Sequence, residues 1–311
     1  MKRDTIVKNY ILSGDKAHDE GKLIKALNYY LKADELLEDE KDIDLIINIA
    51  LIWDELGESK KAKEKYEEVL NINKYEVRAY YGLAVIYDEL EEYKKAIEYY
   101  KKAIEINPVY DRAIFFLANA LDILGKKKEA SYYYKKVIEI CPNDFWAYIN
   151  LGSIYEEVNN VNRSYRMFSK ALELEPNHYM ALFNMGVILN KLNIKDKAKI
   201  YYEKAIKANV GYAYTFLNLA VIYKKEGNLD KAKNILSLGI KYNPQNHFLY
   251  YNRSCFNSRL GCLNEAVDDL IQAVTFYPNF IEYLKDDSDL MLVRETEKFK
   301  NFLKNLRGIN Q

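Results

Sequence analysis

The chain has 311 residues, of which 49% are hydrophobic, and its 46 Lys and Arg balance 46 Asp and Glu. A net charge of zero is not the basic balance that binds nucleic-acid phosphates without sequence preference, so we expect no nucleic-acid partner. No run approaches the ~18 apolar residues of a membrane span, and the N-terminal segment is too polar for a signal-peptide core. These features favour a cytoplasmic protein that does not contact membranes.

Charge is distributed unevenly along the chain. Residues 1–100 carry 16 basic and 23 acidic side chains, whereas residues 101–250 carry 22 basic and 14 acidic ones.

The three cysteines, Cys141, Cys255 and Cys262, contain no closely spaced pair, which argues against both a disulfide framework and a zinc site. We therefore expect three buried small side chains, no metal and no other cofactor.

The sequence is periodic, and the period is marked by proline. Prolines are spaced by one constant interval, or once by twice that interval, at Pro108, Pro142, Pro176, Pro244 and Pro278. Twelve places before each proline stands a small residue, and small residues continue the series where the proline is absent, at Ala26, Ala62 and Ala198. Such a period is typical of a stack of repeated structural units, which at this length can form one continuous domain.

Each unit is predicted to contain two helices. Leu83 and Ala84, followed three residues later by Tyr87, form one helical face that recurs in later units. The first helix is predicted to end at Gly21, Gly57, Gly125, Asn159, Asn193, Gly227 or Gly261, residues that tolerate a left-handed backbone. The second helix should end before the proline. Large aromatic residues should fill the space between units, at Tyr30, Tyr66, Tyr100, Tyr134, Phe168 and Tyr202.

These markers resemble the signature of tetratricopeptide repeats. The resemblance implies an all-α fold, a right-handed superhelical α-solenoid of helix-turn-helix repeats. After an extension at residues 1–6, eight repeats are expected at 7–42, 43–76, 77–110, 111–144, 145–178, 179–212, 213–246 and 247–280. Residues 281–311 are interpreted as capping helices and a tail, because the open end of a solenoid needs a polar cover. The final repeat departs most from this pattern. The usual apolar and small pair is replaced by Arg253 and Ser254, and the usual aromatic residue is replaced by Asn257.

In such repeats the first helices line a concave surface, which is the expected binding site. Asparagine stands directly before the residues that correspond to Leu83 and Ala84 in four consecutive repeats and in one earlier repeat. These asparagines are Asn48, Asn150, Asn184, Asn218 and Asn252. An asparagine amide both donates and accepts hydrogen bonds, so this row could hold the backbone of an extended peptide, as in the asparagine ladders of peptide-binding members of the family. Asparagine is also common at this place whatever the repeats bind. Gly82 and Phe116 interrupt the row.

Other candidate binding residues lie on the same helices. Trp146 and Tyr214 are predicted to be exposed aromatic anchors. Acidic residues such as Asp54 near the ends of the early first helices give way to Lys191, Lys225 and Arg259 in later repeats. This change favours an extended, acidic partner segment between residues 145 and 260, although single charged residues at helix ends are often only solvated.

The sequence does not favour catalysis. His18, His178 and His247 lie far apart in the repeat frame, and no common metalloprotease or serine-hydrolase motif occurs. Some tetratricopeptide cochaperones bind a C-terminal carboxylate with a clamp of basic residues. This clamp is not assembled here, because Gly82 and Phe116 occupy the position of its second basic residue. The leading hypothesis is a non-enzymatic protein–protein interaction scaffold or adaptor. The alternative is a receptor for a short regulatory signalling peptide acting through protein contacts, and self-association remains open.

Overall fold

The computed structural model describes residues 2–38, 40–282, 284 and 287–309, so Met1 and a few cap residues named in the prediction lie outside it. Every regular element in this part of the chain is a helix. The first two pairs are α1 (Lys2–Asp19), α2 (Leu23–Leu37), α3 (Ile43–Glu55) and α4 (Ser59–Ile72). Six further pairs follow: α5 (Val77–Glu89), α6 (Tyr93–Ile106), α7 (Asp111–Ile123), α8 (Lys127–Ile140), α9 (Phe145–Glu157), α10 (Val161–Leu174), α11 (Tyr179–Lys191), α12 (Lys195–Ala208), α13 (Ala213–Lys225), α14 (Leu229–Tyr242), α15 (His247–Arg259) and α16 (Leu263–Phe276).

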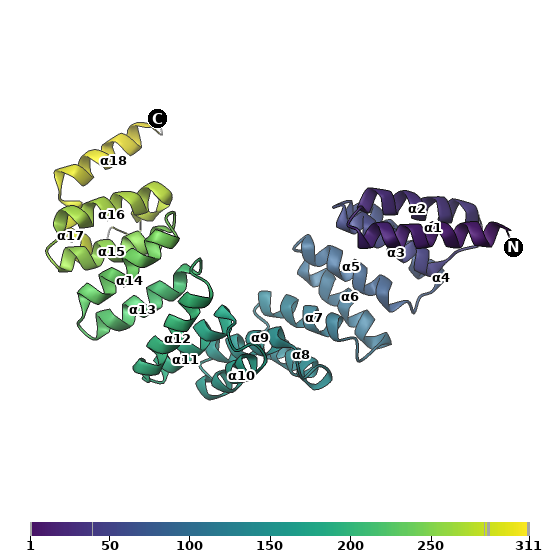
Figure 1. Cartoon of the computed structure of the whole chain (residues 1–311), viewed down its shortest axis with the longest axis horizontal. Helices are drawn as coiled ribbons and strands as arrows, with labels where there is room; N and C mark the ends of the chain where they lie inside the picture. Colours follow the sequence, from purple (N-terminus) through teal and green to yellow (C-terminus); the bar gives the residue numbers. More distant parts are fainter. Residues whose placement is uncertain (1, 39, 283, 285–286, 310–311) are drawn as a thin grey trace. The chain divides into compact units, whose positions relative to one another are not determined.

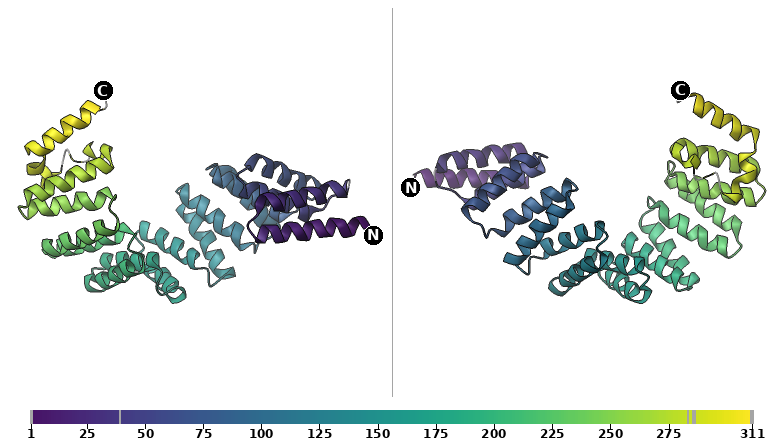
Figure 2. Two further views of the ribbon diagram at one scale, coloured as in Figure 1. Left: turned by 45° about the horizontal axis from the view of Figure 1, so that its top comes forward. Right: turned by 180° about the vertical axis from the view of Figure 1, so that it is seen from behind.

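The helices pack in the order of the chain, and in both compact units the two helices of a pair lie side by side (Figures 1 and 2). The first unit comprises residues 1–147 and the second residues 148–311. The expected all-α solenoid of helix pairs is thus confirmed. Helix α1 already begins at Lys2, inside the segment expected to precede the first repeat. The exact repeat boundaries stay predictions.

The turns between paired helices use a left-handed backbone where the sequence predicted it. All seven predicted turn residues have positive φ, for example 76° at Gly57 and 58° at Asn159. Glu91 adopts the same conformation, with φ of 58°, at the corresponding place in the third pair. The second helices end as expected, since Asn107 before Pro108 is extended with φ of −126° and ψ of 93°.

Aromatic rings fill the core between helices as predicted. The six expected tyrosine and phenylalanine side chains are each no more than 1% exposed. Glycine allows the close approach in some pairs, because a Cβ at Gly152 would lie 2.6 Å from the ring of Phe168.

The expected burial of all three cysteines was wrong for two of them. Cys255 is buried, whereas Cys141 and Cys262 stand at helix ends and are half-buried.

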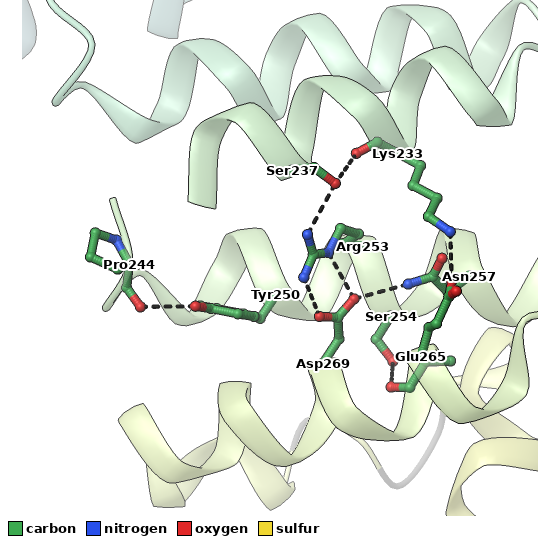
Figure 3. Close-up of polar contacts among 10 residues, drawn as sticks. Lys233, Ser237, Pro244, Tyr250, Arg253, Ser254, Asn257, Glu265 and Asp269 are labelled. Carbon is green, nitrogen blue, oxygen red and sulfur yellow. Dashed lines mark hydrogen bonds and ion pairs between the residues drawn. The ribbon is translucent and has the colours of Figure 1, made fainter. Parts of the chain in front are cut away.

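A polar network replaces part of the apolar core in the last pair (Figure 3). Arg253 donates two hydrogen bonds to Asp269, at 2.9 and 2.6 Å, and one of 3.0 Å to the hydroxyl of Ser237. Asn257 donates to the same carboxylate at 3.0 Å, and Ser254 donates to the carbonyl of Ala266. The donors of Arg253, Ser254 and Asn257, the residues that depart from the repeat pattern, therefore find acceptors on α14 and α16.

After α16 the chain continues with shorter elements, η1 (Pro278–Glu282), η2 (Ser288–Leu290), α17 (Met291–Arg294) and α18 (Glu297–Ile309). Helices α17 and α18 both contact α16. Some of the apolar side chains in these elements are turned inward, since Leu290 and Val293 are fully buried and Phe299 is 2% exposed, whereas Met291 and Leu292 are exposed. This segment, here called the cap, packs against the last pair, and its capping role stays a prediction.

Candidate peptide-binding surface

The five predicted asparagines all lie on first helices and are half-buried. In the second unit, Asn218 donates its amide to the carbonyl of Tyr214 at 2.9 Å, and Asn252 donates to that of Phe248 at 2.8 Å. Asn184 has no hydrogen bond among the described residues. The bonds of Asn218 and Asn252 hold the amide against its own helix and leave the side-chain oxygen to accept a bond from a bound backbone N–H.

The two predicted aromatic anchors are exposed. Trp146 is 46% exposed and Tyr214 is 52% exposed. Trp146 lines a cavity of about 400 Å³ in the first unit, together with other aromatic and charged residues: Tyr81, Asp111, Arg112, Phe115, Phe116 and Asp144. An exposed ring beside such a cavity can bury apolar surface of a ligand.

The predicted basic residues are largely paired with carboxylates of the chain itself. Lys191 forms an ion pair with Glu156 of the preceding helix pair. Arg259 pairs with Asp289 of the cap at 2.9 Å, and Lys224 lies 3.8 Å from the same carboxylate. Lys225 is exposed and has no ion pair in the described part of the chain. The basic character of this region is thus partly neutralised.

The segment after α16 also reaches the surface near the last asparagine of the row. The ring of Phe280 packs edge-on against Tyr251, with centroids 4.8 Å apart. Beside them lies a cavity of about 680 Å³, lined by His247, Phe248, Tyr251, Asn252, Tyr277 and Phe280. The sequence did not indicate this cavity, because Phe280 reaches it from η1, at the very end of the last predicted repeat and after its second helix.

One cluster in the described residues brings possible metal ligands together. Ligand atoms of Cys255, Asp287 and Asp289 lie within 4.8 Å of one another. Asp287 accepts a hydrogen bond from Tyr251, and Asp289 is paired with Arg259. Burial and the two carboxylates raise the pKa of the Cys255 thiol to about 12, so the thiol keeps its proton. These contacts make the cluster a polar attachment of the cap to α15.

A further cavity lies in the first unit where Gly82 interrupts the asparagine row. It measures about 280 Å³ and is lined by Ile47, Leu51, Asp54, Tyr66, Arg78, Tyr81, Gly82, Val85 and Tyr110. The sequence showed only a gap at this place. The signal that could have indicated a special place is Gly82 itself, which lets the ring of Tyr66 approach in a row that, from the second repeat onward, otherwise holds asparagine or phenylalanine.

The histidines are not brought together. His18 lies 3.0 Å from Glu55, and His247 packs between the rings of Phe248 and Tyr277. His178 precedes α11.

No helix in the described residues has the length and apolar character needed to cross a membrane.

Comparison with known proteins agrees with this architecture. A tetratricopeptide repeat model matches residues 77–110, and the middle TPR-like domain of cilia and flagella-associated protein 70 matches residues 114–238. No curated protein sequence matches the chain.

Three solved structures illustrate the similarity. YrrB, described as a TPR protein with an unusual peptide-binding site, is 25% identical with a TM-score of 0.53, over 60% of this chain and 95% of its own. A chain of the Cut9-Hcn1 complex, an APC/C hetero-tetramer, is 16% identical with a TM-score of 0.56, over 91% of this chain and 52% of its own. PilF of Pseudomonas aeruginosa is 20% identical with a TM-score of 0.54, over 74% and 97%.

The tandem helix pairs and the polar and aromatic residues on their first helices define a helical-repeat protein of the class that binds other proteins. Together with the matched repeat model and the similar solved structures, they identify the chain as a tetratricopeptide repeat protein.

Proposed function

We propose that the chain is a non-enzymatic scaffold that binds an extended segment of a partner protein along its first helices. The observation that carries this proposal is the row of asparagines in the second unit, where Asn218 and Asn252 keep a side-chain oxygen available to a bound backbone. The exposed ring of Tyr214 next to this row supports it. YrrB, described as having a peptide-binding site, is consistent with the same use of the fold.

The partner segment of the second unit is proposed to be acidic. Arg259 and Lys224 form ion pairs with the carboxylate of Asp289 within the chain. These pairs support the view that this end of the surface binds acidic groups. Lys225, which follows Lys224 in the sequence, adds an exposed positive charge at the end of α13. An acidic segment would replace the carboxylate of the cap or extend the pairing to Lys225.

The test is a double substitution, Asn184→Ala with Asn218→Ala, measured by calorimetry against a partner segment identified by affinity capture. Two lost hydrogen bonds of about 1 kcal/mol each predict at least about tenfold weaker binding. Asn234→Ala, an exposed asparagine on the second helix α14, is the matched control and should leave the affinity unchanged. Equal affinity of the double variant and the unmodified chain would contradict the proposed role of the row.

A further inference from the structure

The cavity at Gly82 is a recess at the place where glycine interrupts the row of first-helix side chains. The residues in the corresponding places carry side chains, such as Asn48 one pair earlier and Phe116 one pair later. At Gly82 the ring of Tyr66 takes that space, since a Cβ there would lie 2.2 Å from its Cζ. Glycine at position 82 therefore lets the ring of Tyr66 approach the first helix, and both residues line the recess.

A hydrogen bond found in the next helix pair is absent at this recess. In the third pair, the hydroxyl of Tyr100 donates to Asp88 at 3.0 Å. Tyr66 and Asp54 hold the same places one period earlier, yet no hydrogen bond joins them in the described structure. The Oδ1 atom of Asp54 is buried and has no hydrogen-bond partner, and Tyr66 is only 1% exposed. The buried Oδ1 atom of Asp54 thus lacks the partner that Asp88 has in the next pair, an arrangement that costs free energy unless a ligand supplies a donor.

The charge around the recess is negative. Burial, Glu89 and Glu55 raise the pKa of Asp54 to about 6, so at neutral pH its carboxylate is mostly ionised without a counter-ion among the described residues. The cation in the wall is Arg78, and it is already paired with Glu76 and Asp44, each at 2.7 Å. A cationic ligand would neutralise Asp54, whereas an acidic ligand would add repulsion.

We propose that this recess receives a basic side chain, lysine or arginine, from the segment bound by the protein. The inference deepens the proposed function and rests on it. The aliphatic stem of such a side chain would contact Ile47, Leu51 and Val85, which line the cavity. Its charged end would donate to Asp54 next to the ring of Tyr81, where a cation is also attracted to the aromatic face. An uncharged apolar side chain would leave the Asp54 carboxylate buried and unpaired.

The experiment uses the full chain and three capped single residues as probes: N-acetyl-lysine methylamide, N-acetyl-arginine methylamide and N-acetyl-norleucine methylamide. Backbone amide shifts are followed by NMR during titration. We expect saturable shifts of Gly82 and Asp54 with the lysine or the arginine probe, and at least tenfold weaker binding of norleucine, which has an aliphatic stem of similar length but no charge. The two basic probes distinguish an ammonium site from a guanidinium site.

Two variants complete the experiment. Asp54→Asn should abolish the shifts caused by the basic probe, whereas Asp88→Asn, the corresponding change in the next pair, should leave them intact. Asp54→Asn removes an unpaired charge from a partly buried place, so loss of binding would not reflect unfolding. Binding of norleucine as tight as that of the basic probes, or unchanged binding to the Asp54→Asn variant, would overturn the proposal. Because the probes do not require the asparagine row of the second unit, such a failure is distinct from a failure of the Asn184 and Asn218 test.

Discussion

At the scale of the residue, Glu91 holds a backbone conformation that its side chain does not favour. Its φ is 58° at a turn where most other pairs have glycine or asparagine. A left-handed conformation costs a residue with a Cβ about 1 kcal/mol, and glycine avoids this cost. We therefore predict that Glu91→Gly raises the free energy of unfolding by about 0.5–1 kcal/mol, measured by urea denaturation. The reverse change, Gly125→Glu, should lower it by a similar amount, and a destabilised Glu91→Gly variant would contradict this explanation.

Asp54 predicts a pH dependence of stability. Its pKa is about 6 in the folded chain and near 3.8 when unperturbed, because of burial and the adjacent Glu89 and Glu55. The folded state therefore binds the proton more tightly, and this contribution to stability, present at pH 4, is lost as the pH rises through about 6.

Asp54→Asn should accordingly raise the melting temperature at pH 7, with a gain of about 1 kcal/mol after allowance for partial exposure. The gain should shrink toward pH 4, as thermal unfolding across this range would show. A lower melting temperature of the variant at pH 7 would mean that the carboxylate has a stabilising partner.

At the scale of the element, the last helix pair exchanges an apolar group of residues for a polar one. Tyr87 stacks on Tyr99 in the third pair, with centroids 5.4 Å apart and planes at 11°. Asn257 and Asp269 stand at the corresponding places, five periods later, and Arg253 corresponds to Leu83. The three substitutions are compatible because they bond to one another.

This exchange predicts opposite effects of single and combined changes. Asp269→Ala leaves the half-buried Arg253 without its carboxylate and should cost about 3 kcal/mol, because a largely desolvated charge without a partner is expensive. The triple change Arg253→Leu, Asn257→Tyr and Asp269→Tyr restores the apolar group and should be neutral or stabilising. Hydrogen exchange of α15 and α16 measures both effects locally, as suits a repeat protein whose ends can open separately. A triple variant as destabilised as Asp269→Ala would contradict this view.

The sequence predicted the helices well and the polar contacts poorly, for a physical reason. The repeat period reflects close packing between neighbouring pairs, so it indicated helix ends, turn glycines and buried rings. It indicated Arg253 and Asn257 as departures but not their partner Asp269, because aspartate on a helix is usually solvated. Glu91 was not predicted as a turn residue, because glutamate has no preference for a left-handed backbone.

At the scale of the whole molecule, the charge pattern read from the sequence is modified by contacts between distant segments. Arg259 was expected to face a ligand, yet Asp289 of the cap lies against it and against Lys224. Such pairing depends on how the cap folds back onto α13 and α15, which a period within the repeats cannot reveal. The exposure of Trp146 and Tyr214, in contrast, follows from their places on the first helices and was predicted.

The pairing with Asp289 yields a further prediction. Asp289→Asn removes the carboxylate that neutralises Arg259 and Lys224, so an acidic peptide should bind this region more tightly. Fluorescence anisotropy with a labelled hexaglutamate peptide at low salt should show severalfold higher affinity than for the unmodified chain. Asp268→Asn, which affects an acidic residue on α16 paired with Lys298, is the control and should have little effect. Unchanged affinity after Asp289→Asn would argue against an acidic ligand at this end.

Whether partners bind on the first helices can be decided by site-directed photocrosslinking. A benzoylphenylalanine residue is placed at Tyr214 on the first helix α13, and in a separate variant at Tyr165 on the second helix α10; the two tyrosines are 52% and 42% exposed. After irradiation in lysate, we expect a crosslinked partner protein from position 214 and none from position 165. Crosslinking to the same partner only from position 165 would mean that binding occurs on the second helices instead.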